Sequence, residues 1–323
     1  MKERKFKNIL ITGISGSVGS YLAEFLIEKK QKFIINGFFR KRNNLKYLKN
    51  NIKKVKLFKI NLNSFNQTKN YLSKINPDLI FHLASNADVK KSFEQPREII
   101  LNNNNCTLNL LESVRILKIN PIIIISSTSE VYGNSEKKII NENEIINPNN
   151  PYAVSKTFQD MLANVYFRCF NLKIITIRMF TYLNARRNNL FASNWVNQLI
   201  QIEKNNQKYL KHGNLKSYRS IMSINDAVSG YWLAATKGRI GEIYNIGGGK
   251  NIQLKQFLKI IIKNSKKKIN TKIDKNLLRK TDIKQQIPSS KKFIKHTGWK
   301  ASTRFEEILK KFYNEIKINR LIN

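Results

Sequence analysis

Hydrophobic residues in the first 180 positions fall into short runs that alternate with longer amphipathic segments. Such runs are typical of strands buried in a parallel sheet, and Ile122 to Ile125 is the clearest of them. The predicted strands are 8–12, 32–39, 54–60, 79–83, 121–126 and 173–179. The predicted helices are 20–30, about 102–118 and 153–170. Strands that alternate with helices in this order predict a parallel sheet with helices on both faces.

The alternation weakens after Phe180, so the second half of the chain is expected to be organised differently. We predict an α/β fold with a doubly wound parallel-sheet Rossmann domain over residues 1–180. A smaller C-terminal substrate-binding lobe is predicted over 181–323, with interleaved segments that return to the first domain. A chain of 323 residues can bury a sizeable core in this way. The run Asn102 to Asn105 is expected to cap the helix near 102–118.

A glycine-rich turn links the first predicted strand to the first predicted helix. Gly13 would allow a tight turn, Gly16 the close approach of a phosphate, and Gly19 the close packing of helix on strand. Ser17 and Val18 lie between Gly16 and Gly19, just before the predicted helix, and are expected to bind the cofactor with them. Backbone N–H groups and a helix N-terminus together suit a pyrophosphate, so this turn predicts dinucleotide binding despite its G-x-x-G-x-x-G spacing.

Four groups with complementary chemistry follow the fifth predicted strand: the Thr128 hydroxyl, the Glu130 carboxylate, the Tyr152 phenol and the Lys156 ammonium. Tyr152 and Lys156 are four residues apart and would share one face of a helix. A phenol with the ordinary pKa of about 10 is a poor base, and a neighbouring ammonium is expected to lower that pKa. Together the groups could move protons and hydride on a sugar. The alternative for Glu130 is a purely structural carboxylate.

With these motifs the chain resembles, almost end to end, the extended short-chain dehydrogenase/reductase family of nucleotide-sugar epimerases and dehydratases. In that family a Ser or Thr and Tyr-x-x-x-Lys form the oxidising unit, and Thr128, Tyr152 and Lys156 hold those positions. The triplet 128–130, Thr-Ser-Glu, is more similar to GDP-mannose 4,6-dehydratases, and also to UDP-glucuronate decarboxylases. The resemblance implies a homodimer or homotetramer built through the helices near 102–118 and 153–170.

The resemblance implies a nucleotide-diphosphate sugar as substrate, with GDP-mannose as the first choice. Tyr152 would take the proton of the 4-hydroxyl during transient oxidation at C4, and Thr128 would bind the C4 oxygen. Glu130 would remove the C5 proton and protonate the leaving C6 hydroxyl, and Lys156 would hold the cofactor ribose. The alternatives are a 4-epimerase, a 4-keto-6-deoxy-sugar reductase or a UDP-glucuronate decarboxylase. A catalytically idle nucleotide- or polyanion-binding protein is the alternative of another class.

Cofactor choice is predicted from the end of the second strand, where NAD enzymes usually carry an acidic residue. Arg40 stands there and is followed by two further cations, which favours the 2′-phosphate of NADP over NAD. The alternative is that these cations belong to a generally basic surface. The resemblance also assigns Asn61 and Leu62, after the third strand, and Ala84, after the fourth, to cofactor binding.

Three residues of the second half are predicted to contact the substrate. Thr181 stands where the family commonly has an Asn. Arg219 and Arg279 resemble the family's arginines that contact the nucleotide diphosphate, for which a guanidinium fork is suited. The alternative is that both arginines are ordinary surface residues.

The chain carries 59 basic residues against 21 acidic residues, a formal net charge of +38. The basic residues are spread along the sequence without a nucleic-acid-binding motif, so no specific nucleic-acid partner is expected. Cys106 and Cys169 predict neither a disulfide framework nor a metal site. No apolar run reaches the length of a membrane span and no signal peptide is recognisable, which predicts a cytoplasmic protein without a membrane partner.

Overall fold

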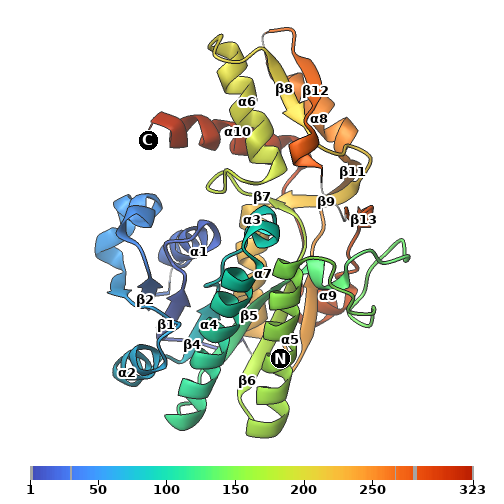
Figure 1. Ribbon diagram of the computed structural model, residues 1–323. Coiled ribbons are helices and arrows are strands. Elements are labelled where there is room, and N and C mark those ends of the chain that lie inside the picture. The colour runs from blue at the N-terminus through green and yellow to red at the C-terminus, as the bar shows by residue number, and fades with distance from the viewer. Residues whose placement is uncertain (1–2, 30, 266, 279–281, 322–323) are drawn as a thin grey trace.

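The computed structural model of the chain describes residues 3–29, 31–265, 267–278 and 282–321. Within these ranges, seven parallel strands form one sheet in the order β10-β6-β5-β4-β1-β2-β3 (Figure 1). The strands are β1 (Asn8–Thr12), β2 (Ile34–Phe39), β3 (Lys56–Lys59), β4 (Leu79–His82), β5 (Ile122–Thr128), β6 (Lys173–Met179) and β10 (Ile243–Ile246). All six predicted strands form, and the order reverses between β1 and β4. The predicted doubly wound α/β fold is confirmed.

Helices cover both faces of this sheet. The helices on the sheet are α1 (Ser17–Ile27), α2 (Phe65–Ile75), α4 (Pro96–Ile116), α5 (Pro151–Phe170), α7 (Ile224–Lys237) and α9 (Lys291–Thr297). The short α3 (Val89–Glu94) contacts α4 and α5, and the 3₁₀ segments are η1 (Arg42–Lys54) and η2 (Ser129–Tyr132). Apolar residues of α1, α7 and α9 pack on one face, and those of α2, α4 and α5 pack on the other. In the described part of the chain, no helix combines the length and apolar character that crossing a bilayer requires.

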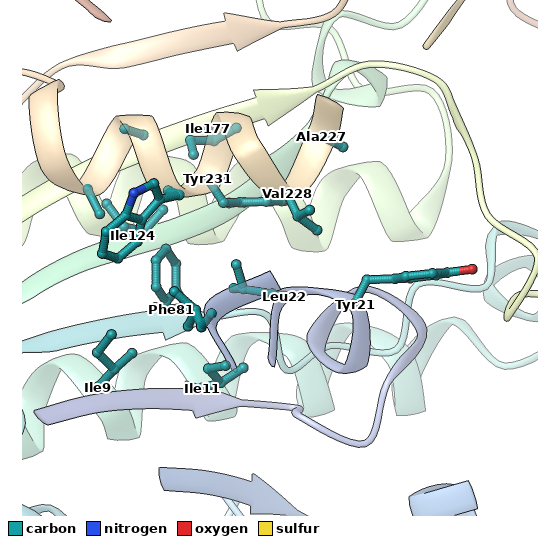
Figure 2. Packing of buried hydrophobic residues seen from close by; sticks show 14 of the residues in the cluster. Ile9, Ile11, Tyr21, Leu22, Phe81, Ile124, Ile177, Ala227, Val228 and Tyr231 are labelled. Atoms are coloured by element: carbon teal, nitrogen blue, oxygen red, sulfur yellow. The ribbon is translucent and has the colours of Figure 1, made fainter. Parts of the chain in front are cut away.

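Alternation of side chains along the strands builds the two faces of the core. Ile9 and Ile11 of β1 lie in the cluster covered by α1 and α7, while Leu10 between them lies in the opposite cluster. Figure 2 shows Leu22 of α1 and Val228 of α7 turned toward the same layer of strand side chains. Strands buried on both faces need continuous apolar runs, which is why their sequences are recognisable.

The start of α4 corrects one prediction. The helix begins at Pro96, six residues before the predicted cap, so Asn102 to Asn105 lie inside it. Proline suits the first helical position because its fixed φ matches the helix and its missing N–H would be unsatisfied there anyway. The buried Asn103 instead bridges elements, since its Nδ2 donates to the Ser155 Oγ at 2.9 Å and to the Asn86 carbonyl oxygen at 3.0 Å. The run of Asn residues resembles a capping sequence, but Asn103 serves a tertiary contact inside the helix.

A second apolar cluster lies beyond the sheet, in the upper part of Figure 1, where α6, α8 and α10 pack together. Its elements are β7 (Tyr182–Leu183), α6 (Phe191–Glu203), β8 (Tyr209–His212), β9 (Tyr218–Ser223), β11 (Lys250–Gln253), α8 (Leu254–Ile262), β12 (Asn270–Ile273), η3 (Lys275–Leu277), β13 (Gln285–Gln286) and α10 (Phe305–Leu321). Between them in sequence, α7, β10 and α9 belong to the sheet. The two clusters favour the predicted division at residue 180, which stays a prediction.

Candidate active site

A cavity of about 690 Å³ lies at the carboxyl edge of the sheet. In Figure 1 this edge faces the part of the molecule that holds α6, α8 and α10. The cavity is lined from both sides, by the β1–α1 turn, the end of β5 and the start of α5, and by the segment that runs from β6 through α6. Ligands of open α/β sheets bind at this edge, where the strand order reverses.

The glycine turn forms one end of the cavity, and all five residues predicted there line it: Gly13, Gly16, Ser17, Val18 and Gly19. Gly13 has a φ of +71°, and a Cβ on Gly19 would lie 2.3 Å from the Gly13 carbonyl oxygen. Only glycine allows α1 to begin this close to β1. Because the first turn of α1 has neither a side-chain cap nor an acidic residue, its N–H groups suit a pyrophosphate.

Four further predicted cofactor residues lie at the ends of neighbouring strands but not in the cavity lining. Arg40 follows β2 and is exposed, and its Nη1 donates to the Asn102 Oδ1 at 3.0 Å. Asn61 is exposed as well, whereas Leu62 is buried in the core beneath α2 and α4. Ala84 follows β4 beside the glycine turn, since a Cβ on Gly13 would lie 2.9 Å from its Cα. Of these four residues, Ala84 lies beside the turn, and all four lie outside the cavity lining.

The predicted catalytic residues come together in the cavity wall. Thr128 ends β5, Glu130 begins η2, and Tyr152 and Lys156 lie one turn apart near the start of α5. Tyr152 and Lys156 are almost fully buried, at 7% and 3% exposure. The Lys156 Nζ donates to the Ser126 carbonyl oxygen of β5 at 2.7 Å, which fixes α5 against the strand.

Burial dominates the electrostatics of the Tyr–Lys pair. Burial raises the pKa of Tyr152, against the lowering effects of the Arg187 guanidinium and of a hydrogen bond with Thr128. Burial also lowers the pKa of Lys156 to about 7, and the positive charge of Arg187 lowers it further, whereas Asp160 raises it. The predicted fall in the Tyr152 pKa is therefore wrong for this structure. Removal of the phenol from water outweighs attraction by cations, and the cation that opposes it is Arg187, not Lys156.

Glu130 lines the cavity, with its side chain held at one oxygen. The Glu130 Oε2 accepts a hydrogen bond from the Asn150 Nδ2 at 2.9 Å, and the Glu130 backbone N–H donates to the Thr128 Oγ1 at 3.3 Å. Among the residues that the structure describes, no cation forms an ion pair with this carboxylate. The alternative of a purely structural carboxylate is therefore not supported by an ion pair within those residues.

Arg187 is a cavity residue that sequence reasoning missed. It follows β7, where its Nη2 donates to the Ala87 carbonyl oxygen and its Nε to the Asn189 Oδ1 at 3.1 Å. The sequence shows two adjacent arginines, Arg186 and Arg187, but their side chains have different partners in the structure. Arg186 instead forms an ion pair with Glu24 of α1 at 2.6 Å. Adjacent arginines cannot be told apart before the loop geometry is known.

The predicted substrate residues divide into three outcomes. Thr181 lines the cavity, two residues after the end of β6. Arg219 of β9 also lines it and is buried, with its Nη1 donating to the carbonyl oxygens of Tyr218 at 2.8 Å and Ile283 at 3.0 Å. Arg279 lies outside the described residues. Thr181 and Arg219 are therefore positioned to contact a ligand that extends from the catalytic residues toward β9.

Comparison with known proteins gives one family and a set of distant relatives. The sequence model of the GDP-mannose 4,6 dehydratase family matches residues 10–312. A dTDP-D-glucose 4,6-dehydratase of Dictyostelium discoideum is 32% identical over 75% of this chain and 58% of its own length. A UDP-glucuronate 4-epimerase of Thermodesulfobacterium geofontis is 28% identical over 96% of each chain. The crystal structure of UDP-glucuronic acid 4-epimerase from Bacillus cereus, in complex with UDP-glucuronic acid and NAD, is similar with a TM-score of 0.85 and 25% identity, over 96% of this chain and 99% of its own.

Proposed function

This chain belongs to the GDP-mannose 4,6-dehydratase family of nucleotide-sugar enzymes, and from that membership we propose that it is a nucleotide-sugar 4,6-dehydratase. The observation that carries the proposal is Glu130, which lines the cavity together with Thr128 and Tyr152. Oxidation and reduction at C4 need the Thr–Tyr–Lys unit alone, whereas elimination across C5 and C6 also needs a base for the C5 proton. GDP-mannose is the substrate that we favour, because the Thr-Ser-Glu triplet at 128–130 resembles the corresponding triplet of GDP-mannose 4,6-dehydratases.

The proposed chemistry assigns each proton to a residue of this chain. Tyr152 takes the proton of the 4-hydroxyl, while Thr128 binds the C4 oxygen. Glu130 then takes the C5 proton, which a 4-ketone makes acidic, and gives it to the C6 hydroxyl, so that the C6–O bond breaks and water leaves. Tyr152 has gained one proton from the 4-hydroxyl, and C5 takes up one proton when the product forms, so the number of protons on the enzyme is unchanged over the cycle. Arg187 favours the ionised phenol during the first step.

A nicotinamide dinucleotide would be held by the glycine turn, with its pyrophosphate at the start of α1 and its ribose beside Lys156. When bound, it would supply oxidation at C4 and reduction at C6, so that the net reaction is loss of water. The uncapped first turn of α1 and its approach to Gly13 fit such a group. Arg40 supports NADP over NAD, because its exposed guanidinium stands where an acidic residue would select NAD.

A nucleotide-sugar 4-epimerase is the second candidate. The two UDP-glucuronate 4-epimerases described above are similar to this chain over 96% of its length. An epimerase would use Thr128, Tyr152 and Lys156 in the same way and would not require the Glu130 carboxylate. The two candidates therefore make opposite predictions for a Glu130 variant.

The first experiment is mass spectrometry of GDP-mannose incubated with the purified protein and a trace of NADP. Loss of one water with no net cofactor turnover is the expected result. If GDP-mannose is unchanged, the same assay is applied to dTDP-glucose and UDP-glucose. Inversion at C4 without loss of water would replace the dehydratase with the epimerase, and an unchanged panel would contradict both. Activity that survives Tyr152→Phe would contradict the assigned role of the phenol.

Glu130→Gln is the decisive variant. Removal of the base is expected to lower the rate of water loss by about 10²- to 10⁴-fold, because a positioned acid–base group contributes about that much. Oxidation at C4 should survive, measured as the absorbance of reduced nicotinamide in a single turnover. Glu144→Gln, in the loop outside the cavity, is the matched control. Loss of water by Glu130→Gln at the wild-type rate would contradict the role of Glu130 as the base for the C5 proton.

A further inference from the structure

We propose that Asn150 is a positioning residue for Glu130, which sets the direction from which the carboxylate approaches C5; this inference rests on the proposed function. Asn150 is 7% exposed and lies two residues before Tyr152, as the N-cap of α5. Its Oδ1 accepts a hydrogen bond from the Ala153 backbone N–H at 2.8 Å. Its Nδ2 donates to the Glu130 Oε2 at 2.9 Å. One amide thus joins the helix that carries the phenol to the carboxylate.

The orientation of this amide is determined by its partners. A backbone N–H can only donate, so the amide atom that faces Ala153 must be the oxygen. The nitrogen must then face Glu130, where a carboxylate oxygen can accept. The Nδ2 also donates to the Asn149 Oδ1 at 3.2 Å. Rotation of the amide would break the helix cap, and therefore the donor to Glu130 is held in place by the start of α5.

Because Oε2 of Glu130 is held by Asn150, Oε1 is the oxygen left to act on the substrate. Within the ranges that the structure describes, the Glu130 Oε2 accepts the hydrogen bond from Asn150, and the Glu130 Oε1 accepts no hydrogen bond. Both Glu130 and Tyr152 line the cavity. The hydrogen bond therefore leaves Oε1 as the carboxylate oxygen that can receive the C5 proton. It also makes the base move together with the phenol, because both are attached to the first turn of α5.

Two substitutions separate positioning from helix capping. Asn, Asp and Ser are about equally good N-caps, so Asn150→Ser and Asn150→Asp should keep the Ala153 hydrogen bond. Neither keeps the amide donor to Glu130, and Asp places a second carboxylate beside it. We expect both variants to eliminate water about 10- to 100-fold more slowly, since a misplaced catalytic group loses up to about 10²-fold, while C4 oxidation is retained. In Asn150→Asp the acid limb of the elimination pH profile should also move to higher pH, because two adjacent carboxylates retain a proton between them.

Controls exclude a general loss of structure. Hydrogen–deuterium exchange of the peptide containing Ala153 should stay slow in both variants and become fast in Asn150→Ala, which lacks a cap. In a Glu130→Gln background, Asn150→Ser should lower elimination no further, because coupled residues are not additive. Wild-type elimination rates in Asn150→Ser and Asn150→Asp, or equal losses of C4 oxidation and of elimination, would overturn the inference.

A spectroscopic readout keeps this test separate from that of the proposed function. The side-chain amide resonance of Asn150, assigned by its loss in Asn150→Ser, should have a different chemical shift in Glu130→Gln, because the acceptor of its hydrogen bond is then an amide group instead of a carboxylate. A resonance that is the same in the wild type and in Glu130→Gln would contradict the inference whether or not the enzyme eliminates water. Conversely, the expected spectra without elimination from any sugar of the panel would contradict the proposed function alone.

Discussion

At the scale of single residues, burial decides the character of the catalytic pair. Tyr152 and Lys156 are almost fully buried in the cavity wall, and this burial drives both toward their neutral forms. The sequence spacing correctly placed the phenol and the amine on one helical turn, but it led to a wrong expectation for the pKa of the phenol. Spacing reports which groups share a helix face, whereas a pKa also depends on solvent and on cations such as Arg187 from distant segments.

Lys156→Met is expected to change how stability depends on pH. Folding lowers the pKa of Lys156 from 10.5 to about 7, so between these values the unfolded chain binds more protons and wild-type stability rises with pH. The variant lacks this dependence. Its free energy of unfolding minus that of the wild type should therefore decrease as the pH rises from about 7 to about 10. The difference should shrink by a few kcal/mol, on the order of 1.4 kcal/mol per pKa unit.

Urea unfolding at a series of pH values measures this change for Lys156→Met. The exposed Lys259 of α8 supplies the control, because Lys259→Met should leave the pH dependence of the wild type unchanged. Parallel curves for the wild type and Lys156→Met would show that the buried amine does not lose its proton in this range.

At the scale of elements, a buried ion pair joins α5 to the two strands beside it. Asp160 of α5 accepts hydrogen bonds from the Ser127 Oγ of β5 at 2.9 Å and from the Arg178 Nε of β6 at 2.8 Å. The Arg178 Nη1 also donates to the Tyr132 hydroxyl of η2 at 2.9 Å. These bonds hold the helix that carries the catalytic pair against the strand that leads to Glu130. A pair with both charges buried is strongly destabilising when one partner is removed.

Arg178→Met should lower the free energy of unfolding by about 3–5 kcal/mol, because it leaves the Asp160 carboxylate buried without a cation. The double variant Arg178→Met/Asp160→Leu should recover part of that loss. Lys292→Met is the control: it removes a partly exposed ion pair with Glu242 and should change the free energy by about 1 kcal/mol or less. Chemical denaturation measures all three values. Similar losses for the buried and the exposed pair would contradict the assignment.

At the scale of the whole molecule, α4 and α5 lie side by side on one face and expose apolar side chains. On α5 these residues recur at helical spacing along one stripe: Val154, Phe158, Met161 and Val165. On α4 they include Leu101, Leu108 and Ile116. A continuous apolar stripe on two adjacent helices suits packing against the same helices of a second copy. We therefore propose a dimer through α4 and α5, as the sequence resemblance implied.

Light scattering of the wild type should give twice the chain mass of 37.7 kDa. The double variant Met161→Lys/Val165→Lys should give a monomer, because it places like charges across the stripe. Ile145→Lys, at an exposed loop position outside α4 and α5, is the control. The formal charge of +38 should oppose association at low ionic strength, so the dimer should dissociate as salt is removed. A wild-type monomer at all salt concentrations would contradict the proposal.

The sequence by itself determined the sheet and the positions of the groups with catalytic potential. The run Ile122 to Ile125 in β5 must be apolar to be buried on both faces of the sheet, and Gly19 must lack a Cβ to let α1 approach β1. Both requirements are local and can be read from the sequence. Only the tertiary structure decided that β10 joins β6 as the seventh strand of the described sheet, that Arg187 faces the cavity, and that Asn150 holds Glu130. Those features depend on contacts between segments distant along the chain, which no local pattern of residues specifies.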